Sequence, residues 1–79
     1  MKELVEYVVK SLVSKPDEVD VTEGVDGSFI NLSLKVNPAD MGLVIGKGGQ
    51  MIKSIRKLLS IRAMAENSRV NLQLVEVSV

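Results

Sequence analysis

The sequence predicts an α+β fold with the element order α-β-β-α-α-β, in which helices pack on one face of a three-stranded mixed sheet. Apolar side chains recur with helical spacing over residues 2–14 and 50–66. They alternate with polar side chains around residues 19–21, 30–36 and 70–74, as half-buried strands do. The segment between the last two strands is long enough for a crossover, so those two strands are expected to run parallel.

The first helix is expected over residues 2–14, where one stripe contains the apolar side chains Leu4, Val5, Val8, Val9, Leu12 and Val13. Pro16 ends it, because proline lacks the N–H that a helix interior needs. Strands around Val19 and Val21 and from Ile30 to Val36 should pair as a hairpin. The Gly-Val-Asp-Gly sequence at residues 24–27 is expected to form its turn.

Residues 37–40 (Asn-Pro-Ala-Asp) are typical of a helix start, with asparagine as N-cap, proline at the first helical position and a carboxylate near the positive helix end. This helix must be short because three glycines follow within residues 46–49. A second helix is expected over residues 50–66 and should stop near Asn67 and Ser68. The last strand begins at Val70, alternates to Leu74 and is expected to continue to Val77 after a change of face.

Composition excludes several kinds of site. The chain has 79 residues, which suits a single domain over residues 1–79, and contains no histidine, cysteine or tryptophan. Disulfides, thiolate nucleophiles and imidazole bases are therefore impossible, and zinc, iron–sulfur and haem sites lose their usual ligands. We expect no metal, no cofactor and no catalysis. Without an apolar leader or a membrane-length apolar run, we also expect a cytoplasmic protein that does not bind membranes.

The charges divide the chain into two halves of opposite sign. Residues 1–40 carry four lysines against eight carboxylates, a net charge of −4, and residues 41–79 carry six basic side chains against two acidic ones, a net charge of +4. Between Leu43 and Ala65 there are five basic side chains and no acidic one. This asymmetry indicates either an anionic partner for the basic half or a solvated helix face that is basic.

Residues 46–49 (Gly-Lys-Gly-Gly) form a loop between the two central helices. A P-loop is excluded because only three residues separate Gly42 from the Gly-Lys pair and no serine or threonine follows it. A dinucleotide fingerprint would need a third glycine where Met51 stands. A G-x-x-G loop instead lets the backbone approach a phosphodiester closely, beside the free N–H groups of the next helix and the charge of Lys47. The alternative is a corner in which glycines merely permit the turn.

The segment Val-Ile-Gly-Lys-Gly-Gly-Gln-Met-Ile at residues 44–52 resembles the signature of KH domains, in which hydrophobic residues flank a GXXG loop. The element order matches the bacterial type II arrangement over essentially the whole chain. This resemblance implies a type II KH fold and non-catalytic binding of single-stranded RNA, with DNA not excluded. It also implies a cytoplasmic homodimer that pairs with a larger KH-containing protein of the KhpB/Jag type and acts in post-transcriptional regulation and cell elongation.

The residues expected to bind RNA lie in the loop, at its flanks and at the start of the next helix: Ile45, Gly46, Lys47, Gly48, Gly49, Gln50, Ile52, Lys53, Arg56 and Lys57. The resemblance implies that the four loop residues hold phosphates, since GXXG loops clamp the backbone of about four nucleotides. Ile45 and Ile52 would either support bases or belong to the core. Lys53 lies one turn from the loop, whereas Arg56 and Lys57 either contact phosphate or are solvated.

The second central helix also carries apolar side chains outside its core face. At about 100° per residue, that face contains Ile52, Ile55, Leu59 and Ala63. Ile61 and Met64 fall outside it and are a candidate dimer contact. The alternative to RNA binding is therefore a subunit whose KH surface mainly mediates dimerisation or partner docking. With only Tyr7 and Phe29 as aromatics, the sequence does not predict a base-stacking platform.

Overall fold

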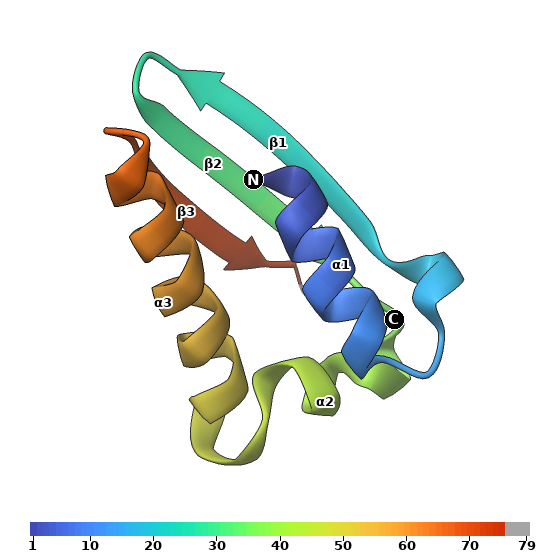
Figure 1. Ribbon diagram of the computed structural model, residues 1–79. Coiled ribbons are helices and arrows are strands. Elements are labelled where there is room, and N and C mark those ends of the chain that lie inside the picture. Colours follow the sequence, from blue (N-terminus) through green and yellow to red (C-terminus); the bar gives the residue numbers. More distant parts are fainter. Residues whose placement is uncertain (76–79) are drawn as a thin grey trace.

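The predicted order of helices and strands is confirmed by the computed structural model, which describes residues 1–75 (Figure 1). The elements are α1 (Lys2–Leu12), β1 (Asp20–Asp26), β2 (Phe29–Lys35), α2 (Met41–Ile45), α3 (Gln50–Ala65) and β3 (Arg69–Leu74). Short 3₁₀ turns cover Pro16–Glu18, Pro38–Asp40 and Lys47–Gly49. Within residues 1–75 no helix has the length and apolar character that crossing a membrane requires.

The three strands form one mixed sheet in the order β1-β2-β3. β1 and β2 are antiparallel, whereas β2 and β3 are parallel, as the crossover length predicts. In this register Leu34 pairs with both Val21 and Leu74. Because paired residues project from the same face, one face of the sheet is apolar, and α1 and α3 lie across it (Figure 1). α2 lies beyond one end of the sheet and links β2 to α3.

The core lies between this apolar sheet face and the helices. Its buried side chains include Val5, Val9, Val21, Leu32, Leu34, Val36, Val44, Ile52, Ile55, Leu59 and Leu72, and Ala63 is also buried. The core face predicted for α3 is therefore confirmed. Because this side of α3 is held against the sheet, its flanks are left to carry the polar and charged side chains.

The hairpin turn differs from the prediction. β1 continues to Asp26, with Gly24 paired to Asn31, and the turn consists of Gly27 and Ser28 alone. Gly27 has a φ of 61°, and type II′ hairpin turns place glycine at this first loop position. The sequence misleads here because Val21 is the only buried residue of β1, so the strand has no extended apolar alternation.

α1 is shorter than predicted, because Val13 is already extended, with a φ of −92° and a ψ of 158°. α3 ends at Ala65, one residue before the predicted boundary, in a Schellman motif. The N–H of Asn67 donates to the carbonyl of Met64 at 3.2 Å, and the N–H of Ser68 donates to that of Ala63 at 2.8 Å. Asn67 has a φ of 55°, a left-handed conformation that asparagine tolerates better than most residues.

The last strand extends from Arg69 to Leu74. The N–H of Val75 still donates to the carbonyl of Leu34, at 2.8 Å, although Val75 lies outside the strand. The predicted continuation to Val77 falls within residues 76–79, which lie outside the described residues.

Asp40 connects the start of α2 to the segment that follows α1. Asn37 caps the turn at Pro38, as predicted, by accepting a 2.8 Å hydrogen bond from the N–H of Ala39. Asp40 does more than place a charge near a helix start. Its buried carboxylate accepts hydrogen bonds from the hydroxyl of Ser14 at 2.6 Å and from the N–H groups of Ser14 and Lys15, both at 3.1 Å.

These contacts change the acidity of Asp40. The hydrogen bond from the Ser14 hydroxyl lowers the pKa of Asp40 below its ordinary value. The two backbone N–H groups and the charge of Lys15 lower the pKa further, while burial opposes them. Ser14 and Lys15, which precede Asp40 by more than twenty residues, therefore hold the start of α2 against the end of α1. The local helix-start pattern could not predict this contact.

Candidate nucleic-acid interface

The glycine loop joins α2 to α3 by a sharp turn in which its three glycines have different roles. Gly46 has a φ of 75° and a ψ of 173°. A Cβ at this position would lie 2.6 Å from the Cβ of Met51 and 2.9 Å from its backbone nitrogen. Gly48 and Gly49 also have positive φ angles, of 64° and 76°, but no atom lies within 4 Å of a Cβ built on either. Gly46 thus permits the turn, whereas the backbone at Gly48 and Gly49 is open to a ligand.

The N-terminus of α3 meets this open backbone without a capping side chain. Its N-cap is Gly49, no side chain accepts a hydrogen bond there, and its first turn contains no acidic residue. Helix N-termini usually have a Ser, Thr, Asp or Asn cap, or nearby carboxylates, because their N–H groups lack partners within the helix. An open hollow of about 530 Å³ adjoins this helix end, lined by Gly46, Lys47, Gly48, Gln50 and Met51. The hollow therefore combines positive potential with accessible backbone.

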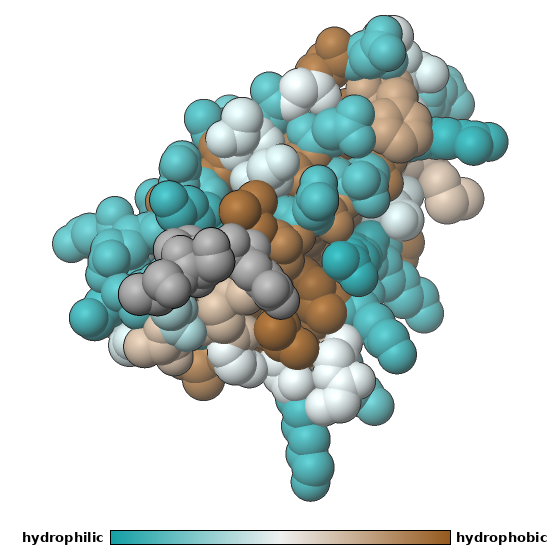
Figure 2. Space-filling view, turned by 180° about the vertical axis from the view of Figure 1, so that it is seen from behind, coloured by the Kyte–Doolittle hydropathy of each residue, from teal (hydrophilic) through white to brown (hydrophobic). Residues whose placement is uncertain are grey.

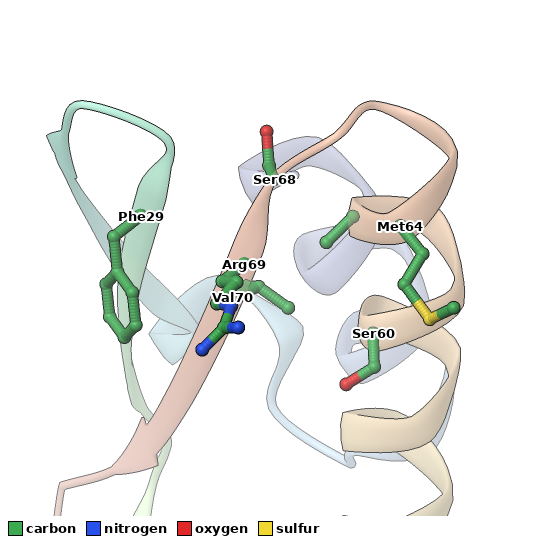
Figure 3. Close-up of a pocket in the computed structure, with 7 residues that line it drawn as sticks. Phe29, Ser60, Met64, Ser68, Arg69 and Val70 are labelled. Carbon is green, nitrogen blue, oxygen red and sulfur yellow. The ribbon is translucent and has the colours of Figure 1, made fainter.

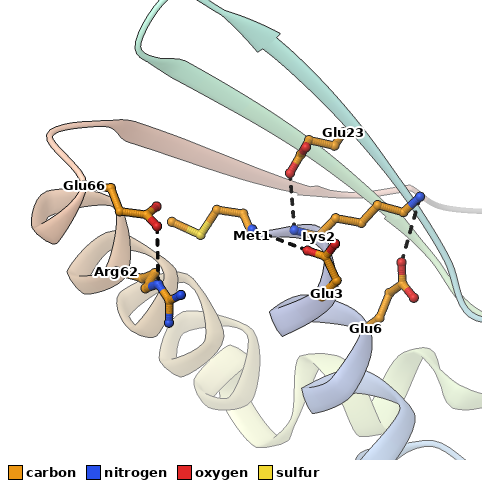
Figure 4. Close-up of polar contacts among 7 residues, drawn as sticks. All are labelled: Met1, Lys2, Glu3, Glu6, Glu23, Arg62 and Glu66. Carbon is orange, nitrogen blue, oxygen red and sulfur yellow. Dashed lines mark hydrogen bonds and ion pairs between the residues drawn. The ribbon is translucent and has the colours of Figure 1, made fainter.

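Four of the five basic side chains in this region are exposed and form no ion pair within residues 1–75: Lys47, Lys53, Arg56 and Lys57. Arg62, the fifth, forms an ion pair with Glu66 at 3.6 Å. Lys2 is similarly paired with Glu6 at 4.0 Å on α1, the other long helix (Figure 4). Four of the seven basic side chains that form no ion pair within residues 1–75 thus lie at the loop and along the first half of α3.

Arg56 connects the basic flank of α3, which consists of Lys53, Arg56 and Lys57, to the free edge of β3. The Nε of Arg56 donates a hydrogen bond to the carbonyl of Leu72 at 3.2 Å. The N–H groups of Arg69 and Val75 donate to the carbonyls of Ser28 and Leu34, both at 2.8 Å, so the odd-numbered residues of this segment direct their backbone groups toward β2. The even-numbered residues between them, including Leu72, direct theirs to the free edge of β3. Arg56 therefore uses one of its hydrogen-bond donors within the protein. Its side chain is nevertheless exposed and belongs to the basic flank.

Apolar surface lies beside these charges. In the view from behind, a brown apolar area is exposed where the end of β3 meets the first half of α3, and teal side chains surround it (Figure 2). Ile45 and Met51 are half-buried on either side of the loop. Ile52, the other side chain expected to support bases or belong to the core, is only 7% exposed and packs in the core. Met51, which is not among the residues that the sequence predicts to bind RNA, lines the loop hollow.

The candidate dimer residues lie farther along α3. Ile61 and Met64 are both exposed, at 59% and 74%. They are about 60° apart around the helix, and they do not share the same surroundings. Met64 lines a second pocket against β3, of which Ile61 is not a lining residue, whereas Ile61 lies between Met64 and the exposed Leu58 on the helix surface. Among residues 1–75 no group of three or more acidic side chains could hold a metal ion.

Comparison with known proteins identifies the family of the chain. The family model described as KhpA/KhpB, KH domain matches residues 2–74. The RNA-binding protein KhpA of Clostridium perfringens is 48% identical over 75 residues, which cover 95% of this chain and 100% of that relative. KhpA of Halalkalibacterium halodurans is 41% identical over 76 residues, covering 96% and 100%, and KhpA of Chlamydia trachomatis is 43% identical over 76 residues, covering 96% and 97%. The chain belongs to the KhpA/KhpB family of KH domains.

Proposed function

We propose that this protein binds single-stranded RNA without catalysing a reaction on it, and that loop 46–49 holds the RNA backbone. The observation that carries the proposal is the uncapped N-terminus of α3, which has no acidic residue in its first turn and opens onto accessible glycine backbone. A phosphate placed there would accept hydrogen bonds from the free N–H groups and interact favourably with the helix dipole. The names of the similar KhpA proteins support RNA as the ligand.

The basic flank of α3 extends this phosphate site. Lys47 belongs to the loop, and Lys53 and Lys57 follow at successive turns of the helix. Each exposed ammonium group can neutralise one phosphate and release bound counterions, so binding should weaken steeply as salt is added. Gln50 at the first position of α3 and Ile45 before the loop complete the proposed contact surface.

The same proposal extends to assembly and cellular role. We infer a cytoplasmic homodimer that pairs with a larger KH-containing protein of the KhpB/Jag type and acts in post-transcriptional regulation and cell elongation. Such pairing would help a shallow binding surface, because two linked RNA sites raise the effective affinity for one strand. DNA is a competing ligand to be measured beside RNA, since the phosphate contacts do not use the 2′-hydroxyl.

The direct test replaces Gly48, whose open surroundings leave space for a side chain. Gly48→Asp and Gly48→Asn have nearly the same shape and are both tolerated at a positive φ, so they differ mainly by one negative charge facing the phosphate. Fluorescence anisotropy with a labelled single-stranded RNA at two salt concentrations should show at least a tenfold loss for Gly48→Asp relative to Gly48→Asn. Equal affinities for the two variants would contradict the assignment of the loop.

A second candidate function is partner docking through the exposed apolar surface of α3. Leu58 and Ile61 are 44% and 59% exposed, although similar residues elsewhere on this helix are buried. Ile61→Glu should shift the protein to a smaller species in sedimentation velocity if this surface mediates dimerisation. RNA affinity per monomer should remain unchanged, because Ile61 lies outside the loop hollow and the basic flank. An unaltered oligomeric state would exclude this surface as the dimer contact.

A further inference from the structure

A second pocket, of about 280 Å³, lies at the opposite end of α3 from the glycine loop. We call it the end pocket; it is lined by Phe29, Ser60, Met64, Ser68, Arg69 and Val70, together with Ala63. Figure 3 shows Phe29 and Met64 on opposite sides of β3, with the side chain of Arg69 between them. β2, β3 and the last turns of α3 each contribute, so the end pocket exists only in the folded protein.

The composition of the end pocket suits a flat, partly polar group. Phe29 is 40% exposed and Met64 is 74% exposed, so an aromatic face and a polarisable thioether are both available to a ligand. The hydroxyl of Ser60 can act as a donor or an acceptor for the edge of such a group, whereas that of Ser68, which donates to the carbonyl of Glu66 at 3.3 Å, can accept. A nucleobase has this combination of an extended π face and a hydrogen-bonding edge.

A cation stands next to the aromatic ring. Phe29 and Arg69 are register partners in the parallel pair β2–β3, so both project from the sheet face opposite to the helices. Within residues 1–75 Arg69 forms no ion pair, and its side chain is exposed. An arginine beside a stacking surface can contact the phosphate of the nucleotide whose base is stacked.

The α3 side of the end pocket, with Ser60 and Met64, continues the basic flank of α3, while Phe29 and Arg69 lie past β3 on the other sheet face. Lys53, Arg56, Lys57, Ser60 and Met64 lie within an arc of about 100° around the helix and lead along it from its first turn to its last. From Gln50 to Met64 the helix rises about 21 Å. That distance is about six nucleotides at a stacked spacing of 3.4 Å and fewer in an extended strand. A strand held at the loop and following this flank would reach the end pocket.

We propose that the end pocket receives a base of the same RNA strand whose backbone is held at loop 46–49, with the base stacked on Phe29 and its phosphate near Arg69. The inference rests on the proposed function and extends its footprint beyond the four nucleotides that a GXXG loop clamps. It also adds one stacked base to a surface for which the composition predicts no base-stacking platform. A single aromatic side chain suffices when the fold places it at the end of the phosphate path.

The absence of tryptophan from the chain makes this testable by fluorescence. Phe29→Trp introduces a single reporter at the end pocket, and Tyr7→Trp introduces one at a 75% exposed position of α1 as the control. Addition of a ten-nucleotide oligoadenylate should quench Phe29→Trp, whereas a four-nucleotide oligoadenylate should bind with little quenching. Tyr7→Trp should respond to neither. Equal quenching of both variants by the ten-nucleotide RNA would overturn the proposal.

Affinities separate this inference from the proposed function. Phe29→Ala should weaken binding of the ten-nucleotide RNA by about fivefold or more and leave that of the four-nucleotide RNA unchanged, because one stacked base is lost. Phe29→Leu preserves an apolar side chain at the strand start and should show most of the same loss. If Gly48→Asp weakens both lengths but the Phe29 variants weaken neither, the loop assignment stands and the end pocket is not a base site. If the unmodified protein binds neither length, the proposed function itself fails.

Discussion

A Cβ placed on Gly46 would lie 2.6 Å from the Cβ of Met51, in the first turn of the helix that follows. This contact explains why the corner between α2 and α3 needs glycine irrespective of any ligand. The backbone angles of Gly46, a φ of 75° and a ψ of 173°, fall in a region that is essentially restricted to glycine. The glycines of one loop thus divide between folding and the proposed RNA binding, and different variants can separate the two roles.

Gly46→Ala should destabilise the protein by about 1–3 kcal/mol from backbone strain, with an added cost where Met51 cannot move aside. Urea denaturation followed by circular dichroism measures the free energy of unfolding. Gly42→Ala is the matched control, because Gly42 lies within α2 and no atom approaches a Cβ built on it. That variant should be as stable as the unmodified protein or slightly more stable. Equal stabilities for the two variants would contradict the assigned packing of Gly46.

Lys53→Ala should reduce the salt dependence of RNA binding without affecting the fold. Removing one phosphate contact should make the slope of log affinity against log salt concentration shallower by about 0.7. Anisotropy titrations at several salt concentrations measure this slope. Arg62→Ala is the control on the same helix, because Arg62 is paired with Glu66 and should not be released for phosphate binding. A larger change for Arg62→Ala than for Lys53→Ala would place the phosphate path on the other flank.

Arg56→Ala should affect both binding and stability, because the Nε of Arg56 donates to the carbonyl of Leu72 on the free edge of β3. Loss of this hydrogen bond should lower the free energy of unfolding by about 0.5–1.5 kcal/mol. Chemical denaturation measures that difference, and the salt slope of RNA binding should fall in parallel. Arg56→Lys retains the charge but not the Nε donor, so it should restore more of the salt slope than of the stability. A fully stable Arg56→Ala variant would contradict a structural role for this bond.

Asp40→Asn should destabilise the protein at neutral pH, and the difference from the unmodified protein should shrink in acid. The pKa of folded Asp40 lies below the ordinary value of about 3.9 that the unfolded chain has, so its carboxylate contributes stability that is fully present above this pH. That contribution is lost as the pH falls toward the lower, folded-state value. Thermal unfolding at pH 7 and at successively lower pH values measures the difference.

Ser14→Ala is the companion variant for this measurement, because it removes the hydroxyl donor that lowers the pKa of Asp40 most. In the Ser14→Ala background the pH-dependent difference between aspartate and asparagine at position 40 should be smaller. A difference that stays constant from neutral pH to well below 4 would show that the charge of Asp40 does not stabilise the fold.

Much of the fold and of the loop site could be read from local patterns. The core face of α3, the parallel crossover and the stop at Asn67 and Ser68 follow from helical periodicity, segment length and turn chemistry, all of which act over a few residues. The same is true of the sharp turn at the GXXG loop between the two central helices, which follows from its three glycines. β1 was underestimated because an edge strand with little burial lacks an apolar alternation to reveal it.

The sequence by itself determined the succession of elements and the place of the basic, glycine-rich loop, because both depend on neighbouring residues. Only the tertiary structure decided which distant groups meet. It brings Asp40 to Ser14, Arg56 to the carbonyl of Leu72, and Phe29 beside Arg69. Such contacts depend on sheet register and helix packing, which no local pattern encodes. The same packing left the N-terminus of α3 uncovered and aligned its basic flank with the end pocket.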